Sequence, residues 1–357
     1  MMPPMHTSAP SSPSFLSTGW PRLVADVGGT NARLAWLAGP GEPLSHLRQL
    51  PTAEHAGFAD AVRAYLQQEG LPAPSQLGMG IANPVTGDHV QMTNCPWQFS
   101  QRELAAELGL EQLVVVNDFT ALALALPVLG DAERRRLGGS LDAQLNAEPG
   151  APIALLGAGT GLGVSGLVPA GPGRWIPLSG EGGHVTLAAT DEREAAILAR
   201  LRQRFGHVSA ERVLSGSGLV NLYTALAELD GRPPRQQQAP TPAELTRRGL
   251  APVGSLESDP LARETLARFC AWLGHVAGDL ALTLGARGGV WIGGGIAPRL
   301  GNFLDDSDFR RRFEAKGRFH DFLGRIPVWL ITAETSPALL GAAQALETVR
   351  TAPQRPE

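Results

Sequence analysis

Short apolar runs alternate with longer apolar-rich stretches along the first third of the chain. The short runs contain many β-branched residues and predict strands at 22–27, 32–37, 77–82 and 113–116. The longer stretches have the length and composition of helices and predict them at 56–69, 100–108 and 119–127. Strands that alternate with helices in this way predict a mixed α/β layer.

A second set of elements follows, and it opens with the apolar strand PIALLG at 152–157. Further patterns predict helices at 191–205, 216–229 and 260–285, and a strand at 289–295. The polar, turn-rich stretch 131–152 predicts a crossing between the two sets, and the proline- and glutamine-rich stretch 230–242 an exposed loop. Because 357 residues exceed the range that one hydrophobic core normally serves, we expect two lobes.

The run LVVVNDFTALALAL at 113–126 joins a predicted strand to a predicted helix through two polar residues, Asn117 and Asp118. Asn and Asp are favoured helix caps, because their side chains accept hydrogen bonds from the free amides of the first turn. Alternatively, the junction places a carboxylate at the carboxyl end of a strand, where open α/β sheets bind ligands. This run alone favours the cap, and the motifs below favour the functional carboxylate.

Two stretches share one plan of apolar strand, Gly/Thr-rich turn and second apolar strand: LVADVGGTNARLAWL at 23–37 and IALLGAGTGLGVSGLV at 153–168. Glycine-rich turns can direct several backbone amides at one anion, so the pair predicts a phosphate chain held from both sides. Taken singly, each could be a hairpin without a ligand. A dinucleotide fingerprint is excluded at 157–163, because the glycine spacing differs and a strand, not a helix, follows.

Three other motifs carry polar or glycine-rich chemistry. WIGGGIAPR at 291–299 could seat a flat ring against its glycines or serve a close strand–helix crossing. SGEGGHVTL contains Glu181 and His184, and a metal site there would need further ligands that its neighbours do not supply. FGHVSAERV contains Glu211. This residue could bind a ligand, but a structural role in the first turn of a helix capped by Ser209 explains it equally well.

Composition narrows the class of protein. A formal net charge of −4 and a pI near 6.1 give no basic surface for nucleic acid. Lys316 is the only lysine, so no Walker A motif exists. The sequence has two cysteines and no apolar run long enough for a membrane helix. The stretch at 1–19 is broken by prolines, and we expect it to be a disordered tail rather than a signal peptide. We therefore expect a cytoplasmic location.

Taken in order, six motifs resemble the bacterial ATP-dependent glucokinases of the hexokinase-like type. They are DVGGTNARLA, NDFTALA, GAGTGLGV, GEGGHV, GHVSAERVLSGSGLVNLY and GGVWIGGGIAPR. The resemblance runs from about Val24 to Ala345 and implies an α/β, two-lobed, actin- and hexokinase-like (ribonuclease H-like) fold with a central cleft. It further implies a small lobe at 20–134, closed by a last helix at 335–350, and a larger lobe at 135–334.

The resemblance also implies roles for individual residues. Asp118 becomes the catalytic base, and the sugar contacts become Asn117, Asp118, Glu181, His184 and Glu211. The expected ATP contacts are Ala25, Asp26, Val27, Gly28, Gly29, Thr30, Asn31, Gly159, Thr160, Gly161, Gly294 and Gly295. Asp26 is expected to hold Mg²⁺ through water. Asn83 departs from the family pattern, so its role stays open.

The implied reaction transfers the γ-phosphoryl group of ATP, with Mg²⁺, to the 6-hydroxyl of glucose. The implied partners are glucose and MgATP, with a second copy of the chain in a homodimer, and neither nucleic acid nor membrane. Two alternatives remain at this point. One is a kinase for another hexose or an amino sugar, and the other is a non-catalytic sugar sensor or an actin-like ATPase. Intact phosphate turns disfavour the sensor, and the Glu181–His184–Glu211 set disfavours the ATPase.

Overall fold

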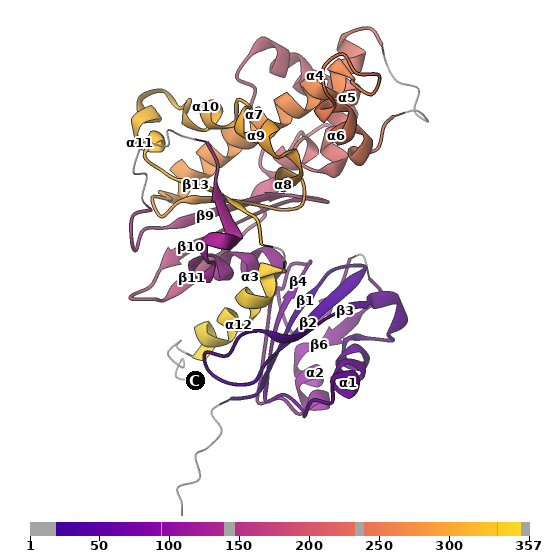
Figure 1. The fold of residues 1–357 in the computed structure, drawn as a ribbon, viewed down its shortest axis with the longest axis vertical. Coiled ribbons are helices and arrows are strands. Elements are labelled where there is room, and N and C mark those ends of the chain that lie inside the picture. The colour runs from indigo at the N-terminus through magenta and orange to yellow at the C-terminus, as the bar shows by residue number, and fades with distance from the viewer. Residues whose placement is uncertain (1–18, 94, 139–146, 233–238, 334, 351–357) are drawn as a thin grey trace, which may run out of the picture.

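The computed structural model describes residues 19–93, 95–138, 147–232, 239–333 and 335–350. Of the predicted tail at 1–19, only Gly19 is among them, so that prediction lies outside the described residues. The elements form two large sheets, each flanked by helices, with a pair of helices between them, and a small two-stranded sheet (Figure 1). Within the described residues, no helix combines the length and apolar character needed to cross a bilayer.

The first sheet has five strands in the order β3-β2-β1-β4-β7. Its strands are β1 (Arg22–Val27), β2 (Asn31–Leu37), β3 (Ser45–Pro51), β4 (Gln76–Ile81) and β7 (Gln112–Asn117). The first three strands pair antiparallel, whereas β1, β4 and β7 are parallel, so β1, β4 and β7 end at the same edge. That common edge is where ligands bind in open α/β sheets.

Side chains that alternate along the strands cover both faces of this sheet. On one face, Leu23, Ala25 and Met79 pack with helices α1 (Phe58–Glu69) and α2 (Gln101–Leu108). On the other face, Val24 packs with the last helix, α12 (Pro337–Arg350). A short antiparallel ribbon of β5 (His89–Gln91) and β6 (Gln98–Ser100) extends the first unit.

The second sheet has six strands in the order β11-β10-β9-β12-β13-β8. Its strands are β8 (Arg134–Arg136), β9 (Ile153–Ala158), β10 (Leu162–Pro169), β11 (Trp175–Ser179), β12 (Val290–Gly293) and β13 (Val328–Ile331). The strands β9, β12 and β13 are parallel, and the hairpin β9–β10–β11 is antiparallel. The second sheet therefore repeats the plan of the first, with a glycine turn joining its opening hairpin.

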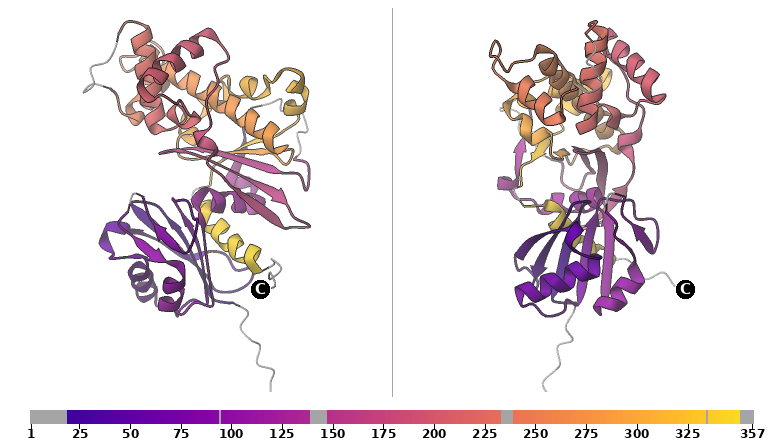
Figure 2. Two further views of the ribbon diagram at one scale, coloured as in Figure 1. Left: turned by 180° about the vertical axis from the view of Figure 1, so that it is seen from behind. Right: turned by 90° about the vertical axis from the view of Figure 1, so that its right-hand side faces the viewer.

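Helices of the second unit gather on the face of this sheet that points away from the first sheet (Figure 2). They are α4 (Glu192–Phe205), α5 (Gly216–Leu229), α6 (Pro242–Leu250), α7 (Pro260–Leu284), α8 (Ala297–Leu300), α9 (Asn302–Asp305), α10 (Phe309–Glu314) and α11 (His320–Gly324). The long helix α7 starts where the Asp259 side chain accepts hydrogen bonds from two first-turn amides, and it ends at Gly285 with φ of 60°.

Helix α3 (Asp118–Ala125) lies between the sheets together with α12. It contacts β4 and β7 of the first sheet, and β10 and β11 of the second. Leu124 of α3 packs in one apolar cluster with Ile153 and Leu155 of β9. The alternate residues of β9, Ala154 and Leu156, belong to the cluster on the opposite face of the second sheet. Helix α3 therefore carries its first residues, including Asp118, to the boundary between the two sheets.

Most predicted elements are confirmed, with bounds shifted by one or two residues. The predicted crossing at 131–152 is wrong in part, because it contains strand β8, which pairs with β13. Within the predicted loop at 230–242, residues 230–232 and 239–241 are neither helix nor strand, residues 233–238 lie outside the described residues, and Pro242 begins α6. The elements that the pattern missed are β3, β5, β6, β8, β11, β13, α6 and the short helices α8–α11. Cys95 and Cys270 are buried free thiols.

Candidate active site

One cavity of about 740 Å³ is lined by segments that follow strands of both sheets. The first unit contributes the turn after β1, the segment after β4 and the start of α3. The second unit contributes the β9–β10 turn, the loop after β11, Glu211, and Gly294 after β12. The predicted site residues that line it are Gly28, Gly29, Asn117, Asp118, Gly159, Thr160, Gly161, Glu181, His184, Glu211 and Gly294.

The other predicted ATP contacts do not line this cavity. Ala25 and Val27 are buried within β1. Residues that adjoin the cavity wall in sequence without lining it are Asp26, Thr30, Asn31 and Gly295. The DVGGTN motif therefore contributes two glycines to the wall and places the other side chains behind or beside them.

At the junction between β7 and α3, one residue caps the helix and the next provides a carboxylate to the cavity. Asn117 caps α3, because its Oδ1 accepts hydrogen bonds from the amides of Phe119 at 3.0 Å and Thr120 at 3.3 Å. Asp118 is the first residue of the helix, and its Oδ1 accepts from the Phe119 amide at 2.8 Å. The cap interpretation is thus correct for Asn117, and the carboxylate of Asp118 lines the cavity.

The carboxyl group of Asp118 has an unusual electrostatic setting. Burial raises the pKa of Asp118 from 3.8 to about 6, the Phe119 amide opposes this rise, and the negative charge of Asp26 adds to it. Asp26 is held in turn by Ser336, whose Oγ donates to Oδ2 at 2.6 Å, and by Arg33 at 3.1 Å. A carboxyl group with a raised pKa in a cavity is typical of functional sites.

The turn between β9 and β10 is joined to the acidic side chain of Glu211. The Leu162 amide donates to Glu211 Oε2 at 2.9 Å. A Cβ at Gly161 would lie 2.5 Å from the same oxygen, so only glycine allows this approach. The prediction for Ser209 is confirmed in part. Ser209 stands at the N-cap position of the 3₁₀ helix η5 (Ala210–Arg212), which has Glu211 in its first turn, but its side chain makes no capping hydrogen bond. The longer helix α5 begins later and is capped by Ser215. Glu211 also binds the β9–β10 turn.

Backbone pairing brings the GEGGH loop beside the segment that carries Glu211. Thr186 and Ser209 form an isolated β-bridge, and the Ala210 amide donates to the Val185 carbonyl at 2.9 Å. As a result Glu181, His184 and Glu211 line the same cavity. Together with Asn117 and Asp118, they present many hydrogen-bonding groups, as a polyhydroxylated ligand requires.

The cavity is acidic. Among the described residues that line it, none is Lys or Arg, while Asp118, Glu181 and Glu211 are carboxylic acids. In the described part of the chain no group of three or more His, Cys, Asp or Glu side chains is arranged to hold a metal ion. The carboxylate of Asp26, whose negative charge acts on Asp118, nevertheless fits Mg²⁺, which binds proteins through one or two carboxylates and completes its shell with water and phosphate.

Asn83 was the predicted exception to the family pattern, and the structure gives it contacts. Its side chain accepts from Thr93 and donates from Nδ2 to the Gln91 carbonyl at 2.8 Å. Its own carbonyl accepts from Asn117 Nδ2 at 3.4 Å. Asn83 therefore holds the 83–93 loop and touches the residue next to Asp118. Sequence reasoning missed this, because the three partners are separated in the chain.

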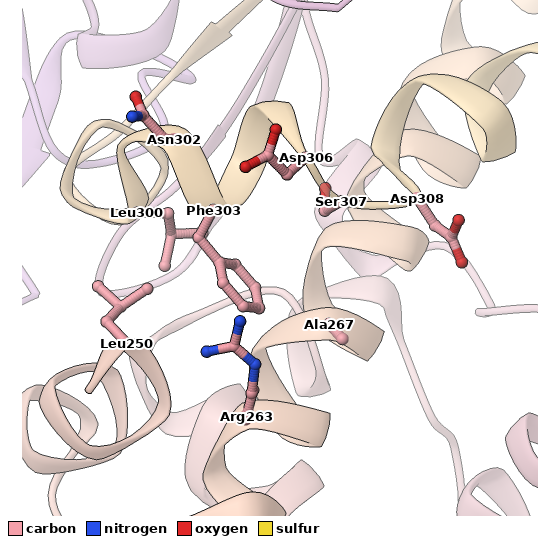
Figure 3. Close-up of a pocket in the computed structure, with 9 residues that line it drawn as sticks. All are labelled: Leu250, Arg263, Ala267, Leu300, Asn302, Phe303, Asp306, Ser307 and Asp308. Atoms are coloured by element: carbon pink, nitrogen blue, oxygen red, sulfur yellow. The ribbon is translucent and has the colours of Figure 1, made fainter. Parts of the chain in front are cut away.

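A second cavity, of about 680 Å³, contains none of the predicted site residues (Figure 3). It lies among α6, α7 and the α8–α10 segment, and its walls are Leu250, Arg263, Ala267, Leu300, Asn302, Phe303, Asp306, Ser307 and Asp308. The Arg263 guanidinium lies 5.2 Å from the Phe303 ring centre and donates to the Gly249 carbonyl. The candidate chemistry therefore belongs to the first cavity.

Comparison with known proteins decides the family. A sequence model of the family described as Glucokinase matches residues 23–349. The chain belongs to the glucokinase family. The glucokinase of Aromatoleum aromaticum is 55% identical over 336 residues, which cover 94% of this chain and 97% of that protein. The glucokinase of Chromobacterium violaceum is 50% identical, over 92% of this chain and 91% of its own.

The solved structures agree with this glucokinase assignment. A crystal structure of glucokinase from an Antarctic psychrotroph superposes with a TM-score of 0.81 at 36% identity, over 92% of this chain and 98% of that chain. The predicted family, the two-lobed hexokinase-like fold class and the prediction of a sugar-kinase enzyme are confirmed.

Proposed function

We propose that this glucokinase-family chain transfers the γ-phosphoryl group of ATP to the 6-hydroxyl of glucose in the 740 Å³ cavity. The observation that supports this best is the position of Asp118 in one cavity with both glycine turns and with the Glu181–His184–Glu211 set. Sugar and triphosphate then meet at the start of α3. The products are glucose 6-phosphate and ADP.

In this proposal Asp118 orients the 6-hydroxyl group and accepts its proton. The hydroxyl oxygen forms a bond to the γ-phosphorus while the bond from that phosphorus to the bridging oxygen breaks, and ADP leaves. A sugar hydroxyl is a poor nucleophile, so a carboxylate within hydrogen-bond reach is needed. With a pKa of about 6, Asp118 is mostly ionised at neutral pH, and its carboxylate is a stronger base than that of an ordinary aspartate.

The phosphate chain is held by backbone amides of the two glycine turns, those of Gly29 and Thr30 and of Thr160 and Gly161, with Thr30 and Thr160 as hydroxyl donors. The amides of Gly28 and Gly159 instead donate to the Asn31 and Gly161 carbonyls within the turns. Alignment and charge stabilisation are most of what phosphoryl transfer requires. Because no lysine or arginine is present among the described residues of the cavity wall, cationic charge has to come from elsewhere. We propose that Asp26 holds Mg²⁺ through water, and that the ion, when bound, would neutralise charge on the phosphates.

The sugar hydroxyls are bound by Asn117, Asp118, Glu181, His184 and Glu211. A sugar that lacks a bonded hydroxyl leaves one of these polar groups unpaired, which can reduce kcat/KM by roughly 10⁴–10⁵. A kinase for another hexose or an amino sugar uses the same groups and remains the second candidate. A panel of glucose, mannose, fructose and N-acetylglucosamine with MgATP in a coupled assay separates the two, since a clear preference for a sugar other than glucose contradicts the first.

Replacement of Asp118 tests the mechanism. Asp118→Ala should lower kcat by about 10²–10⁴, the usual contribution of a positioned base. Circular dichroism and the Tm should stay near those of the unmodified protein. Asp321→Ala, which removes an exposed carboxylate on α11, is the matched control and should keep full activity. Near-normal turnover of a folded Asp118→Ala protein would remove Asp118 from the role of base.

We further propose a homodimer in the cytoplasm, as the family resemblance implies. Two buried, unpaired thiols, Cys95 and Cys270, suit a reducing compartment. Light scattering of the purified protein reports the oligomeric state directly, and a monomer at micromolar concentration would contradict the dimer.

A further inference from the structure

A buried threonine lies directly behind the glycine turn that follows β1. Thr52 is 3% exposed and opens the single-turn 3₁₀ helix η1 (Thr52–Glu54) after β3. Its Oγ1 donates to the Gly29 carbonyl at 2.9 Å, and its backbone amide donates to the Thr30 carbonyl at 2.9 Å. Thr52 thus donates hydrogen bonds to two consecutive carbonyl groups of the turn. Thr52 does not line the cavity, whereas Gly28 and Gly29 do.

These two hydrogen bonds set the direction of the amides. The Gly29 carbonyl and the Thr30 amide belong to one planar trans peptide unit, so they point in opposite directions. When the Thr52 hydroxyl binds the carbonyl, the Thr30 N–H is turned away from the buried side of the turn. Without the hydroxyl, this peptide unit can rotate and exchange the positions of its donor and acceptor.

The segment that carries Thr52 is itself fixed. The Trp97 indole donates from Nε1 to the His55 carbonyl at 3.1 Å, and Trp97 is 1% exposed. The ring of Phe58, at the start of α1, packs against Trp97 at 6.0 Å between centroids. The residues after Thr52 are therefore attached to the core, so its hydroxyl is held in place before any ligand binds.

We propose that Thr52 is a positioning residue for the ATP phosphates, which it serves by orienting the Thr30 peptide amide toward them. This inference rests on the proposed function, in which the 28–30 turn holds phosphate. It assigns to a residue outside the cavity a specific effect on nucleotide affinity and none on sugar affinity. Pre-organised amides bind anions more strongly because no reorientation is needed on binding.

The test compares substitutions that differ by a single hydroxyl group. Thr52→Val keeps the shape of the side chain and removes the hydrogen bond to Gly29, and Thr52→Ser keeps the hydroxyl. The matched control is Thr265→Val, which removes another fully buried threonine hydroxyl, one that donates to the Leu261 carbonyl within α7. The measurements are KM for ATP, KM for glucose, the Kd of a non-hydrolysable ATP analogue by calorimetry, and the Tm.

Thr52→Val should raise the KM for ATP and the Kd of the analogue about fivefold, the loss expected for one hydrogen bond. The KM for glucose should stay within about twofold, since one hydrogen bond contributes little at a distance. Thr52→Ser should restore both nucleotide constants. Thr265→Val should change the Tm alone. If Thr52→Val fails to fold, Thr52→Ala removes the same hydroxyl from a smaller side chain.

Gly28→Ala separates failure of this inference from failure of the proposed function. A Cβ there would lie 3.6 Å from the Asn31 carbonyl oxygen, an ordinary contact, so the fold tolerates the methyl group at the cavity wall. If Gly28→Ala weakens analogue binding and Thr52→Val does not, the positioning role of Thr52 is overturned. If neither variant changes it, the turn does not hold phosphate. If Thr52→Val raises both KM values together with a lower Tm, its role is only structural and the inference is overturned.

Discussion

At the scale of single residues, the chemistry of Asp118 depends on its surroundings. An aspartate on the surface is ionised from about pH 4 upward. In this cavity, burial and then the charge of Asp26 raise the pKa of Asp118 to about 6, against the opposing Phe119 amide. The carboxylate form, which can accept a proton, is therefore the major form only above about pH 6.

This setting predicts an acid limb in the pH profile. As the pH falls through about 6, Asp118 becomes protonated and kcat/KM should fall tenfold per pH unit. Asp26→Asn removes the neighbouring negative charge, so it should move the limb to lower pH whatever it does to the maximal rate. The measurement is kcat/KM from pH 4.5 to 8.5.

Asp131→Asn is the control for the pH profile, because its side chain is 93% exposed and lies outside the cavity. It should leave the limb in place. A limb below pH 5 in the unmodified protein, or one that Asp26→Asn does not shift, would show that Asp118 is not the group that titrates.

Sequence reasoning identified most residues of the cavity, but it did not predict the hydrogen bonds that these residues make. The strand-to-helix junction placed Asp118 at a sheet edge, but the pattern could not show that Asn117 alone makes the cap. The contact of Glu211 with the Leu162 amide spans two motifs and was not predictable from either. Thr52 escaped notice and the contacts of Asn83 were not predicted, because the partners of both residues lie elsewhere in the chain.

Between elements, the closest approach is the crossing of α3 and α12. A Cβ on Gly341 of α12 would lie 1.6 Å from the Ala121 carbonyl oxygen of α3. A Cβ on Gly78 of β4 would lie 2.2 Å from the Ala342 carbonyl oxygen. Helix α12 therefore contacts both α3 and the first sheet through glycines, and the position of α3, which carries Asp118, depends on it.

Gly341→Ala should separate the two helices and lower the free energy of unfolding by about 1–3 kcal/mol or more, as overpacking does. It should also reduce kcat, because α3 moves relative to the glycine turns. Urea unfolding followed by circular dichroism measures the first effect. The control is Gly324→Ala in α11, where a Cβ meets nothing within 4 Å. Equal losses in the two variants would contradict a close crossing of α3 and α12.

The elements found from the pattern were the long or strongly apolar ones. Strand β8 reads Arg134-Arg135-Arg136 and has no apolar signal of its own, since β13 supplies the pairing. The helices α8–α11 are too short for a periodic pattern to be visible. Tertiary contact, rather than local preference, forms these elements.

For the whole molecule, we propose two lobes at 20–134 with 335–350 and at 135–334, since one sheet belongs to each. The cavity lies where strands of both sheets end, so a change in the angle between the lobes changes its volume. Closure on the sugar would exclude water, which competes for the phosphoryl group. The local pattern predicted two α/β units, and only the family resemblance predicted that the last helix returns to the first one.

Small-angle scattering should therefore record a smaller radius of gyration with glucose than without it. L-glucose at the same concentration is the control, because it matches the contrast of the solvent and presents its hydroxyls in the mirror arrangement. Profiles that are identical in the two sugars would contradict closure on sugar binding.

Helix α12 also links the order of synthesis to folding. The first sheet is made of residues translated early, but one of its faces, with Val24 and Ala35, is covered by Leu339 and Ala342. During translation this apolar face stays open until the residues of α12 have left the ribosome. The amino-terminal unit is therefore exposed to chaperones and proteases for longer than its early translation suggests, and a chain cut short before residue 337 leaves that face bare.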